Sequence, residues 1–356
     1  MADGNEQATA GIETAAGAEA PKRRGRGGGG AVRRAERTAR RIQCAPTILR
    51  QIPEMTILDD EALAIIEANA EIVLEETGVA FVDNPAALQL WRDAGADVKG
   101  ERVRIPKGLA RKLCATAPAR FTQVARNPER NVEIGGKNLV LAPVYGPPFV
   151  RDLDGGRRYA TMEDFRNFVK LGYMSKWLQH SGGTVCEPTD VPVNKRHLDM
   201  LMAHMTLSDK PFMGSVTEPS RAQDSIEMCE ILFGKDFVRD NTVMTSLINI
   251  NSPLTFDATM MGALEIYAAH NQAAIISPFI VGGAMAPVSV VGTLTQVLAE
   301  VMAGVAYSQI IRPGAPVIFV TFVSSTDMHS GAPSFGTPAP AHITNCPLST
   351  SHAVDE

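Results

Sequence analysis

The feature that most constrains the fold is a regular alternation of β-rich apolar runs with helical runs, which begins at Asn138. Such alternation is typical of a parallel sheet whose strands are connected by crossover helices. Six right-handed units of this length are most simply built as the first three-quarters of a (β/α)8 barrel. The pattern stops in 331–356. We therefore expect an α/β fold, a TIM-type barrel truncated after about six βα units, with open sheet edges.

The expected strands and helices follow from the period of the apolar residues and from capping signals. Thr161, followed by Asp164 three residues later, predicts an N-cap at the start of the first helix. Gly234 and the Pro313–Gly314 pair predict the ends of the third and fifth helices. The expected strands are Leu139–Ala142, Leu178–Glu187, Phe212–Val216, Thr242–Ile250, Ala274–Val281 and Pro316–Val323. The expected helices lie near 165–171, 197–207, 222–233, 256–270 and 294–311.

A small α+β lead-in is expected ahead of the barrel. Asp59–Asp60 and Asn84–Pro85 each open a helix, and three short strands are expected at Val79–Val82, Arg102–Ile105 and Arg120–Val124. The predicted domains are therefore a disordered basic arm over 1–41, the lead-in over 42–137, the partial barrel over 138–338 and an irregular tail over 339–356.

Charge and cysteine content exclude several classes of function. Residues 1–41 carry nine Lys or Arg and five Asp or Glu, with too little apolar surface to order themselves. The remainder is acidic, which argues against nucleic-acid binding. Five cysteines lie far apart with no C-x-x-C pair, so neither a zinc knuckle nor a disulfide framework is expected and a cytoplasmic protein is favoured.

One long stretch without charged residues, between Glu265 and Glu300, could suggest a membrane span. Prolines and glycines interrupt it, and this punctuation fits a buried strand, a turn and a buried helix better than a bilayer segment. The N-terminus contains no hydrophobic segment of the secretory type. We therefore expect no membrane association.

Candidate site residues come from the carboxyl ends of the expected strands, where parallel βα folds bind ligands. The set contains no lysine and no histidine, so it offers neither a Schiff-base amine nor a metal cluster. It predicts a pocket that orients a substrate while another agent performs the bond chemistry. No catalytic residue and no metal ligand is assigned. The expected substrate-binding residues are Tyr145, Glu187, Ser215, Asn249, Asn251, Gly283 and Ser324.

Each candidate also has a structural interpretation. Glu187 could cap a turn or face solvent, Asn249 and Asn251 could brace a loop, and Tyr145 could be a core aromatic residue. Gly283 belongs to a Gly-Gly pair that is read as a tight βα turn.

Three histidines are predicted to be structural. His180 has no carboxylate partner in view, so it is interpreted as a satisfied core histidine. His197 and His204 lie seven residues apart on one helix face, but no third metal ligand accompanies them.

Several segments resemble the corrinoid-dependent trimethylamine methyltransferase family, and the resemblance covers about residues 35–338. It is specific in the order of its motifs as well as in their content. The segments are Glu75–Val79 (EETGV) at the end of the lead-in helix, Val150–Arg158 (VRDLDGGRR), Tyr159–Phe165 (YATMEDF), Asn251–Leu254 (NSPL) and Ser330–Pro338 (SGAPSFGTP).

The resemblance implies a (β/α)8 barrel that moves a methyl group from a tertiary or quaternary methylated amine, of trimethylamine or betaine type, to a corrinoid protein. The corrinoid (cobalamin) would be carried by that partner, with no tightly bound cofactor on this chain. An ammonium group favours carboxylate and aromatic neighbours, for which Glu187 and Tyr145 are the expected residues. The oligomeric state stays open, a homo-oligomer included.

Family members are longer, and some carry pyrrolysine in the later part, beyond the positions present here. Two alternatives to the methyltransferase remain. One is an inactive truncated remnant, suggested by the exposed edge of the sixth strand. The other is a barrel lyase or isomerase acting on a phosphorylated substrate, which depends only on Gly282–Gly283 and the fold.

Overall fold

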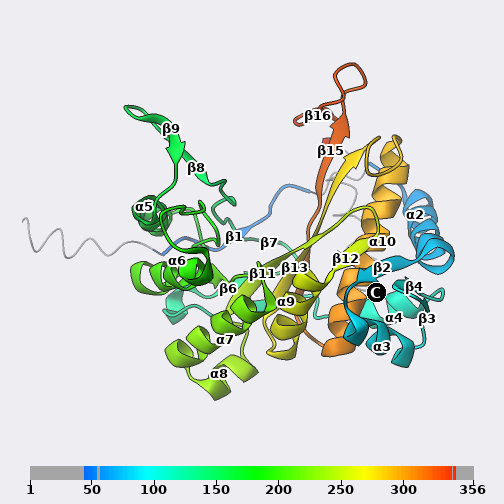
Figure 1. Cartoon of the computed structure of the whole chain (residues 1–356), viewed down its shortest axis with the longest axis horizontal. Helices are drawn as coiled ribbons and strands as arrows, with labels where there is room; N and C mark the ends of the chain where they lie inside the picture. Colours follow the sequence, from blue (N-terminus) through cyan, green and yellow to red (C-terminus); the bar gives the residue numbers. More distant parts are fainter. Residues whose placement is uncertain (1–43, 54–56, 339, 342–356) are drawn as a thin grey trace, which may run out of the picture. The chain divides into compact units, whose positions relative to one another are not determined.

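The computed structural model describes residues 44–53, 57–338 and 340–341. The predicted arm over 1–41 lies outside the described residues, as does nearly all of the predicted tail over 339–356. The described residues form a mixed α/β fold with an open, mainly parallel sheet and an N-terminal α+β part (Figure 1).

The secondary structure has the following bounds. The helices are α2 (Asp60–Ile72), continued by a π-helical turn η1 (Val73–Thr77), α3 (Pro85–Asp93), α4 (Leu109–Cys114), α5 (Met162–Met174), α6 (Val193–Leu207), α7 (Pro219–Phe233), α8 (Lys235–Asp240), α9 (Ala258–Ala269) and α10 (Val290–Ile311), with a 3-10 turn η2 at Pro128–Arg130. The strands are β1 (Ile48–Leu49), β2 (Val79–Val82), β3 (Asp97–Lys99), β4 (Arg102–Arg104), β5 (Phe121–Gln123), β6 (Val132–Ile134), β7 (Asn138–Leu139), β8 (Phe149–Asp152), β9 (Gly156–Tyr159), β10 (Phe212–Met213), β11 (Met244–Ile250), β12 (Thr255–Asp257), β13 (Ala273–Gly282), β14 (Val317–Phe319), β15 (Phe322–Thr326) and β16 (Pro333–Ser334).

The main sheet has the order β10-β11-β13-β15-β16, and β14 also pairs with β13. Every pair is parallel except β15 with β16. The third to sixth predicted strands are therefore confirmed, the sixth as β14 and β15 in one continuous register on β13. These strands could be predicted because long apolar runs are typical of strands in a covered parallel sheet.

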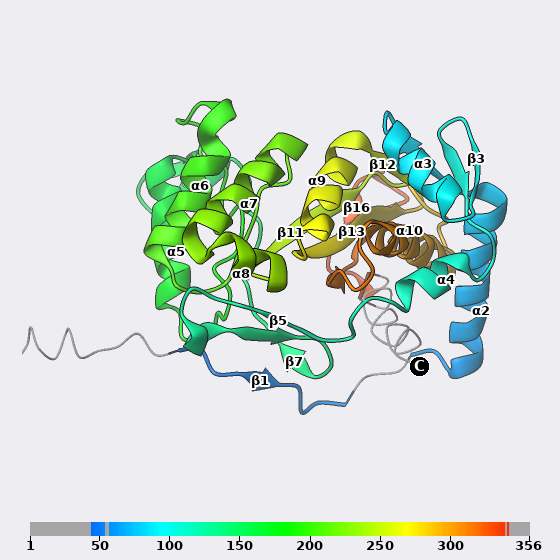
Figure 2. The same ribbon diagram turned by 90° about the horizontal axis from the view of Figure 1, so that it is seen from below.

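One face of this sheet is covered by α9 and α10. Ile248, Ile276 and Ile280 are fully buried on that face. A Cβ atom on Gly304 of α10 would lie 2.8 Å from Ile276 Cγ2, so only glycine allows the helix to approach this closely. Figure 2 shows α10 beside β13, with α2 and α4 along the helix. The opposite face of the sheet, which we call the inner face, carries Asn249.

The first two predicted strands are wrong as regular strands. Of Leu139–Ala142, only Leu139 is in a strand, in β7, which pairs antiparallel with β1, and Leu178–Glu187 contains no strand. Gly182 and Gly183 interrupt the second run, and neither favours regular pairing. Both segments nevertheless lie in the expected order: the Gln179 amide donates to Leu141 O (3.0 Å), and the Met213 amide to Gly182 O (3.0 Å). The result is a half-barrel sheet.

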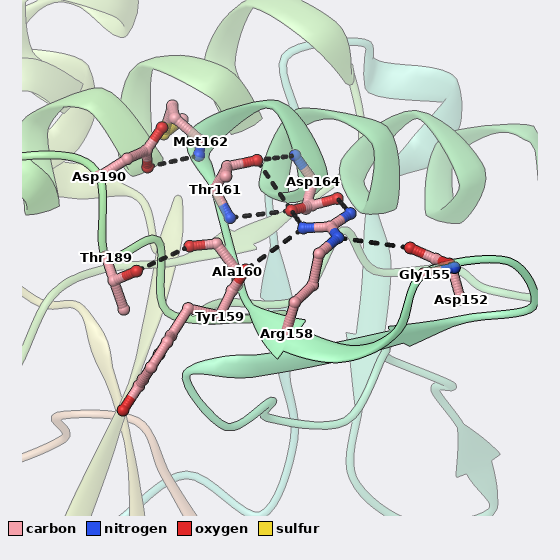
Figure 3. Close-up of polar contacts among 10 residues, drawn as sticks. All are labelled: Asp152, Gly155, Arg158, Tyr159, Ala160, Thr161, Met162, Asp164, Thr189 and Asp190. Atoms are coloured by element: carbon pink, nitrogen blue, oxygen red, sulfur yellow. Dashed lines mark hydrogen bonds and ion pairs between the residues drawn. The ribbon is translucent and has the colours of Figure 1, made fainter.

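The helix after the first segment confirms its predicted N-cap. Thr161 Oγ1 accepts from the Asp164 amide (3.3 Å), and Asp164 Oδ2 accepts from the Thr161 amide (2.8 Å), which is a complete capping box at the start of α5. Arg158 clamps the same carboxylate with Nη1 at 2.6 Å from Oδ2 and Nη2 at 2.8 Å from Oδ1 (Figure 3). Arg158 belongs to the β8–β9 hairpin, which was not predicted as a hairpin and which this clamp ties to α5.

The N-terminal α+β part shares its core with the sheet. β2 pairs antiparallel with β4 and parallel with β12, which follows β11 in the chain. Phe81 of β2 stacks on Phe256 of β12 with ring centroids 4.9 Å apart, and Trp91 and Tyr307 contact the same cluster. The predicted strands Val79–Val82 and Arg102–Ile105 are confirmed as β2 and β4, and the third contains β5, which pairs with the unpredicted β6.

Within the described ranges, one helix, α10, is long and apolar enough to cross a membrane by length and composition. However, 67% of its most apolar window is buried inside the fold, as in the core helix of a globular protein. This arrangement agrees with the strand, turn and buried helix expected for the uncharged stretch.

Candidate functional site

A cavity of about 290 Å³ lies at the carboxyl end of the half-barrel sheet. Its wall is formed by the ends of β10 and β11, by the extended segments around 145 and 184, and by residues of α6, α7 and α9. This volume is near the lower end of the range for small-molecule sites. The position agrees with the rule that parallel βα folds bind ligands at the carboxyl ends of their strands.

The cavity brings together four of the seven residues expected at the site. Tyr145, Glu187, Ser215 and Asn249 all line it, although they are up to about a hundred residues apart in the chain. The exposed Asn249 side chain projects from the inner face of β11. Whether these residues bind a substrate stays a prediction. All four line one cavity, which supports the expectation that they belong to a single site.

The other three candidates do not line the cavity, and each has a structural role. Asn251 Nδ2 donates to Asp257 Oδ2 (2.9 Å), which braces the turn after β11. Gly283 has φ +89° and its amide donates to Ala286 O (2.9 Å). It therefore forms a tight βα turn, as its structural interpretation predicted. The buried Ser324 hydroxyl donates to Ser334 O (3.0 Å) and fixes the β15–β16 pair.

Two glycines let aromatic hydroxyls approach the cavity wall. A Cβ atom on Gly183 would lie 2.7 Å from the Tyr145 hydroxyl, and one on Gly214 would clash with the Tyr267 hydroxyl. The Tyr267 hydroxyl donates to Ser215 O (2.5 Å) and so fixes the backbone that carries Ser215. Sequence reasoning did not identify these glycines, because a close approach is visible only once both partners are placed.

Tyr145 presents an uncharged phenol to the site. The residue as a whole is 39% exposed, and its hydroxyl end lies against Gly183. Burial raises the pKa of Tyr145 to about 12, because the phenolate would lose its hydration. At neutral pH the ring is therefore an amphipathic wall rather than a base.

Glu187 is already paired. Its Oε1 lies 2.5 Å from Nη1 of Arg196, which is on α6 and also lines the cavity. Arg196 is held in place by Nε and Nη2, which both donate to Val191 O. The carboxylate that was expected to face an ammonium group is thus neutralised by a neighbouring cation.

The cavity also contains two histidines that the strand-end set did not include. His204 Nε2 donates to Gly183 O (2.8 Å), because a carbonyl can only accept, and its Nδ1 then accepts from the Ser181 hydroxyl (2.8 Å). Burial lowers the pKa of His204 to about 4, so the ring is neutral at pH 7. His197 Nε2 donates to Asp224 Oδ2 on α7 (2.7 Å). The only sequence signal was their spacing of seven residues on one helix.

His180 is a core histidine, as expected, but only half of its hydrogen-bonding capacity is used. Its Nδ1 accepts from the Gly182 amide (2.9 Å), whereas Nε2 has no partner among the residues that the structure describes. Burial lowers the pKa of His180 to about 3.

Arg221, on α7, is a second cation in the cavity wall. Its Nη1 donates to Thr217 Oγ1 (2.8 Å), and its Nε lies 3.4 Å from Glu218 Oε2. Its side chain is 19% exposed, so water screens its charge only in part. In the part of the chain that the structure covers, no group of three His, Cys, Asp or Glu could hold a metal ion.

A family model described as trimethylamine methyltransferase (MTTB) matches residues 26–347. A glycine betaine methyltransferase of Desulfitobacterium hafniense is 44% identical over 288 residues, which cover 81% of this chain and 60% of the relative. A proline betaine:corrinoid methyltransferase of Eubacterium limosum is 28% identical, covering 75% of this chain and 56% of the relative. A trimethylamine methyltransferase of Methanosarcina barkeri is 24% identical, covering 78% of this chain and 58% of the relative.

The chain thus spans about three fifths of the length of the curated relatives it matches. Among solved structures, MtmB in complex with hydroxylamine is similar with a TM-score of 0.50 and 12% identity, covering 85% of this chain and 67% of that chain. At this identity the likeness concerns the fold alone.

Proposed function

Because this chain belongs to the trimethylamine methyltransferase family, we propose that it acts in the transfer of a methyl group from a quaternary amine of the betaine type to a corrinoid protein. A betaine carries a permanent cation and a carboxylate in one small molecule. The relative with 44% identity is named for glycine betaine, and this supports the substrate class.

The observation that carries the proposal is the distribution of charge in the cavity. Glu187 is the one carboxylate among the described lining residues, and Arg196 neutralises it. Arg221 adds a second guanidinium group to the wall. The Glu218 carboxylate lies 3.4 Å from its Nε, but it is exposed and outside the lining residues, so it offsets this charge only in part. The carboxylate of a zwitterion can pair with the remaining N–H donors of Arg221, which a simple ammonium ion cannot do.

The chemistry of the wall also suits methyl transfer from a quaternary amine. Breaking the bond between the methyl carbon and the nitrogen leaves the electron pair on nitrogen, so this step needs no proton transfer. The neutral Tyr145 and His204 fit such a site, since neither is a base or an acid at neutral pH. The corrinoid, carried by a partner protein, would supply the nucleophile that accepts the methyl group, and the residues described here would bind and orient the amine.

We further propose that the half-barrel sheet is part of a (β/α)8 barrel. Three features support this proposal. The strands β10, β11, β13 and β15 are parallel and adjacent in this order, and the helices α9 and α10 pack on one face of the sheet. A cavity lies at the carboxyl ends of the strands, where such barrels bind ligands.

Binding tests the substrate class. In calorimetric titrations of the full chain, we expect Arg221→Gln to weaken glycine betaine about tenfold, the usual cost of losing a charge-assisted hydrogen bond. Tetramethylammonium, which has the cation but no carboxylate, should bind the variant no more weakly than the wild-type chain. Arg239→Gln, which changes an exposed arginine of α8, is the matched control. Equal weakening of both ligands would contradict the carboxylate role of Arg221.

Turnover tests the reaction. The full chain is mixed with free cob(I)alamin and either glycine betaine or trimethylamine, and methylcobalamin formation is followed by absorbance. We expect formation only with the betaine. If neither amine yields methylcobalamin, the transfer activity of this chain is refuted and the inactive remnant becomes the better account.

A further inference from the structure

The loop between β10 and α7, residues 214–218, is fixed at the cavity wall by side chains around it. The Ser215 amide donates to Ser225 Oγ (3.1 Å), and the Ser225 hydroxyl in turn donates to Arg221 O (2.8 Å). From the other side, the Tyr267 hydroxyl donates to Ser215 O (2.5 Å). Both backbone polar groups of Ser215 therefore have side-chain partners, and the loop has little freedom to move.

The first turn of α7 is also fixed, because Pro219 packs closely on α9. A Cβ atom on Gly262 of α9 would lie 2.6 Å from Pro219 Cγ, so this approach requires a glycine. Arg221 follows two residues later and lines the cavity. Its guanidinium group is therefore carried by a backbone whose position is set on both sides.

The hydroxyl groups of Ser215 and Thr217, which both line the cavity, keep one hydrogen that their contacts do not use. The two oxygens lie 3.4 Å apart, and either hydroxyl can be the donor in this contact. Thr217 Oγ1 also accepts from Arg221 Nη1 at 2.8 Å. Among the residues that the structure describes, neither hydroxyl has a further partner. One O–H is therefore left for a ligand, whichever of the two donates to the other.

Arg221 keeps donors of its own beside these hydroxyl groups. Nη1 gives one hydrogen to Thr217 and Nε faces the exposed Glu218 carboxylate, so the second hydrogen of Nη1 and both hydrogens of Nη2 remain within the described part of the chain. A carboxylate only accepts hydrogen bonds, and it has two oxygens. One oxygen can therefore pair with the guanidinium group while the other accepts from the hydroxyl.

We propose that Ser215, Thr217 and Arg221 form a carboxylate subsite, in which Thr217 sets the preference for a betaine over a quaternary amine that carries an alcohol group. Thr217 acts in two ways: its oxygen positions the Arg221 guanidinium group, and its hydroxyl, shared with Ser215, provides the additional donor. The inference rests on the proposed function, which supplies a zwitterionic substrate. It adds Thr217 to the site, a residue that the strand-end prediction did not include.

Ligand selectivity tests this subsite. Choline carries the same trimethylammonium group as glycine betaine, but a hydroxyl group in place of the carboxylate. In calorimetric titrations of the full chain, we expect Thr217→Val to weaken glycine betaine about fivefold, the usual cost of losing a hydrogen bond, and to leave the affinity for choline unchanged. Thr217→Ser, which keeps the hydroxyl, should restore the affinity for glycine betaine. Ser215→Ala should cost less than Thr217→Val, because the Thr217 hydroxyl is then free to donate to the ligand.

The matched control is Thr206→Val on α6, an exposed threonine outside the cavity wall whose hydroxyl donates to Met202 O. It should change neither affinity. Equal weakening of glycine betaine and choline by Thr217→Val would overturn the proposal, because it would indicate a general disturbance of the cavity. An unchanged affinity for glycine betaine in Thr217→Val would overturn it as well, and the loop would then be a structural connection only.

Failure of this inference and failure of the proposed function give different results. If the wild-type chain does not bind glycine betaine, the proposed substrate class falls. Saturation-transfer NMR with sodium acetate, a carboxylate without a cation, then still decides whether the subsite binds a carboxylate in a Thr217-dependent manner. If glycine betaine binds and Arg221→Gln weakens it, but the Thr217 variants have no effect, only the inference falls.

Discussion

At the scale of single residues, two buried imidazoles near the cavity link stability to pH. Burial lowers the pKa of His204 to about 4 and that of His180 to about 3, whereas a histidine in an unfolded chain titrates near 6.5. Below about pH 6.5 the unfolded chain therefore binds protons that the folded chain does not. Stability is then complete above that pH and falls as the pH is lowered toward 4.

We expect the unfolding free energy to fall with a slope of up to about 1.4 kcal/mol per pH unit for each of these histidines. Urea unfolding of the full chain between pH 7 and 4.5 measures this slope. The variant His204→Gln should lose the contribution of His204 to this slope. The control variant is His329→Gln, on the exposed loop after β15, which should leave the slope unchanged. An unaltered slope in His204→Gln would mean that the buried imidazole is not the cause.

Residues at strand ends were predictable, but residues contributed by helices were not. Ser215 and Asn249 line the cavity because the carboxyl ends of the parallel strands β10 and β11 meet at one edge. Tyr145 and Glu187 line it from extended segments that occupy the expected places in the order without forming regular strands. Arg221 lies on a helix, and the charge periodicity of a helix does not show which turn faces a cavity. The ion pair of Glu187 could not be predicted for the same reason, because its partner Arg196 lies on a helix.

At the scale of elements, the start of α5 is fixed by a local polar network. Thr161 and Asp164 cap each other, and Arg158 holds the Asp164 carboxylate so that its pKa lies well below the usual range. A carboxyl group with a depressed pKa stabilises the fold above about pH 4, and this contribution is lost as the pH falls further. The network also connects α5 to the β8–β9 hairpin (Figure 3).

Thr161→Ala removes the side-chain acceptor for the helix N-terminus. We expect it to lower the unfolding free energy by about 1 kcal/mol at pH 7, the typical cost of losing an N-cap. Chemical denaturation measures the change. The comparison is Thr206→Ala on α6, whose hydroxyl donates to Met202 O inside a helix and caps nothing. A loss for Thr161→Ala no larger than that of the comparison would show that the capping box adds little.

The elements differ in how far the sequence determines them locally. Apolar runs such as Ala274–Val281 carry their own strand signal, and Thr161 with Asp164 carries its own helix signal. The segment around Gly182 and Gly183 has no such signal, because its extended form depends on partners on both sides. Short strands such as β6 and β16 likewise depend on pairing with a distant neighbour rather than on their own composition.

At the scale of the whole described fold, the aromatic cluster of Phe81, Trp91, Phe256 and Tyr307 joins the N-terminal part to the sheet. Trp91 is fully buried there, whereas Trp177, the other tryptophan of the chain, is 54% exposed. Because the two regions share one core, we expect them to unfold together rather than in sequence.

In a Trp177→Phe background, the fluorescence of Trp91 reports on this junction alone. Its urea transition should coincide with that of the far-UV circular dichroism, which reports on all helices and strands. The further change Trp91→Ala should lower the common midpoint through a loss of about 3 to 5 kcal/mol, as for a large buried aromatic side chain. Two separate transitions in the Trp177→Phe protein would show instead that the N-terminal part folds independently.

The parallel pairing of β2 with β12 has a consequence for synthesis on the ribosome. Val79–Val82 emerges long before Thr255–Asp257, the segment that completes its sheet. At the usual rate of translation of about 5 to 20 residues per second, the nascent strand waits roughly 9 to 35 s for that partner. During this interval its apolar face is open to other nascent chains, so the yield of folded protein should depend on chaperones that shield the early segment.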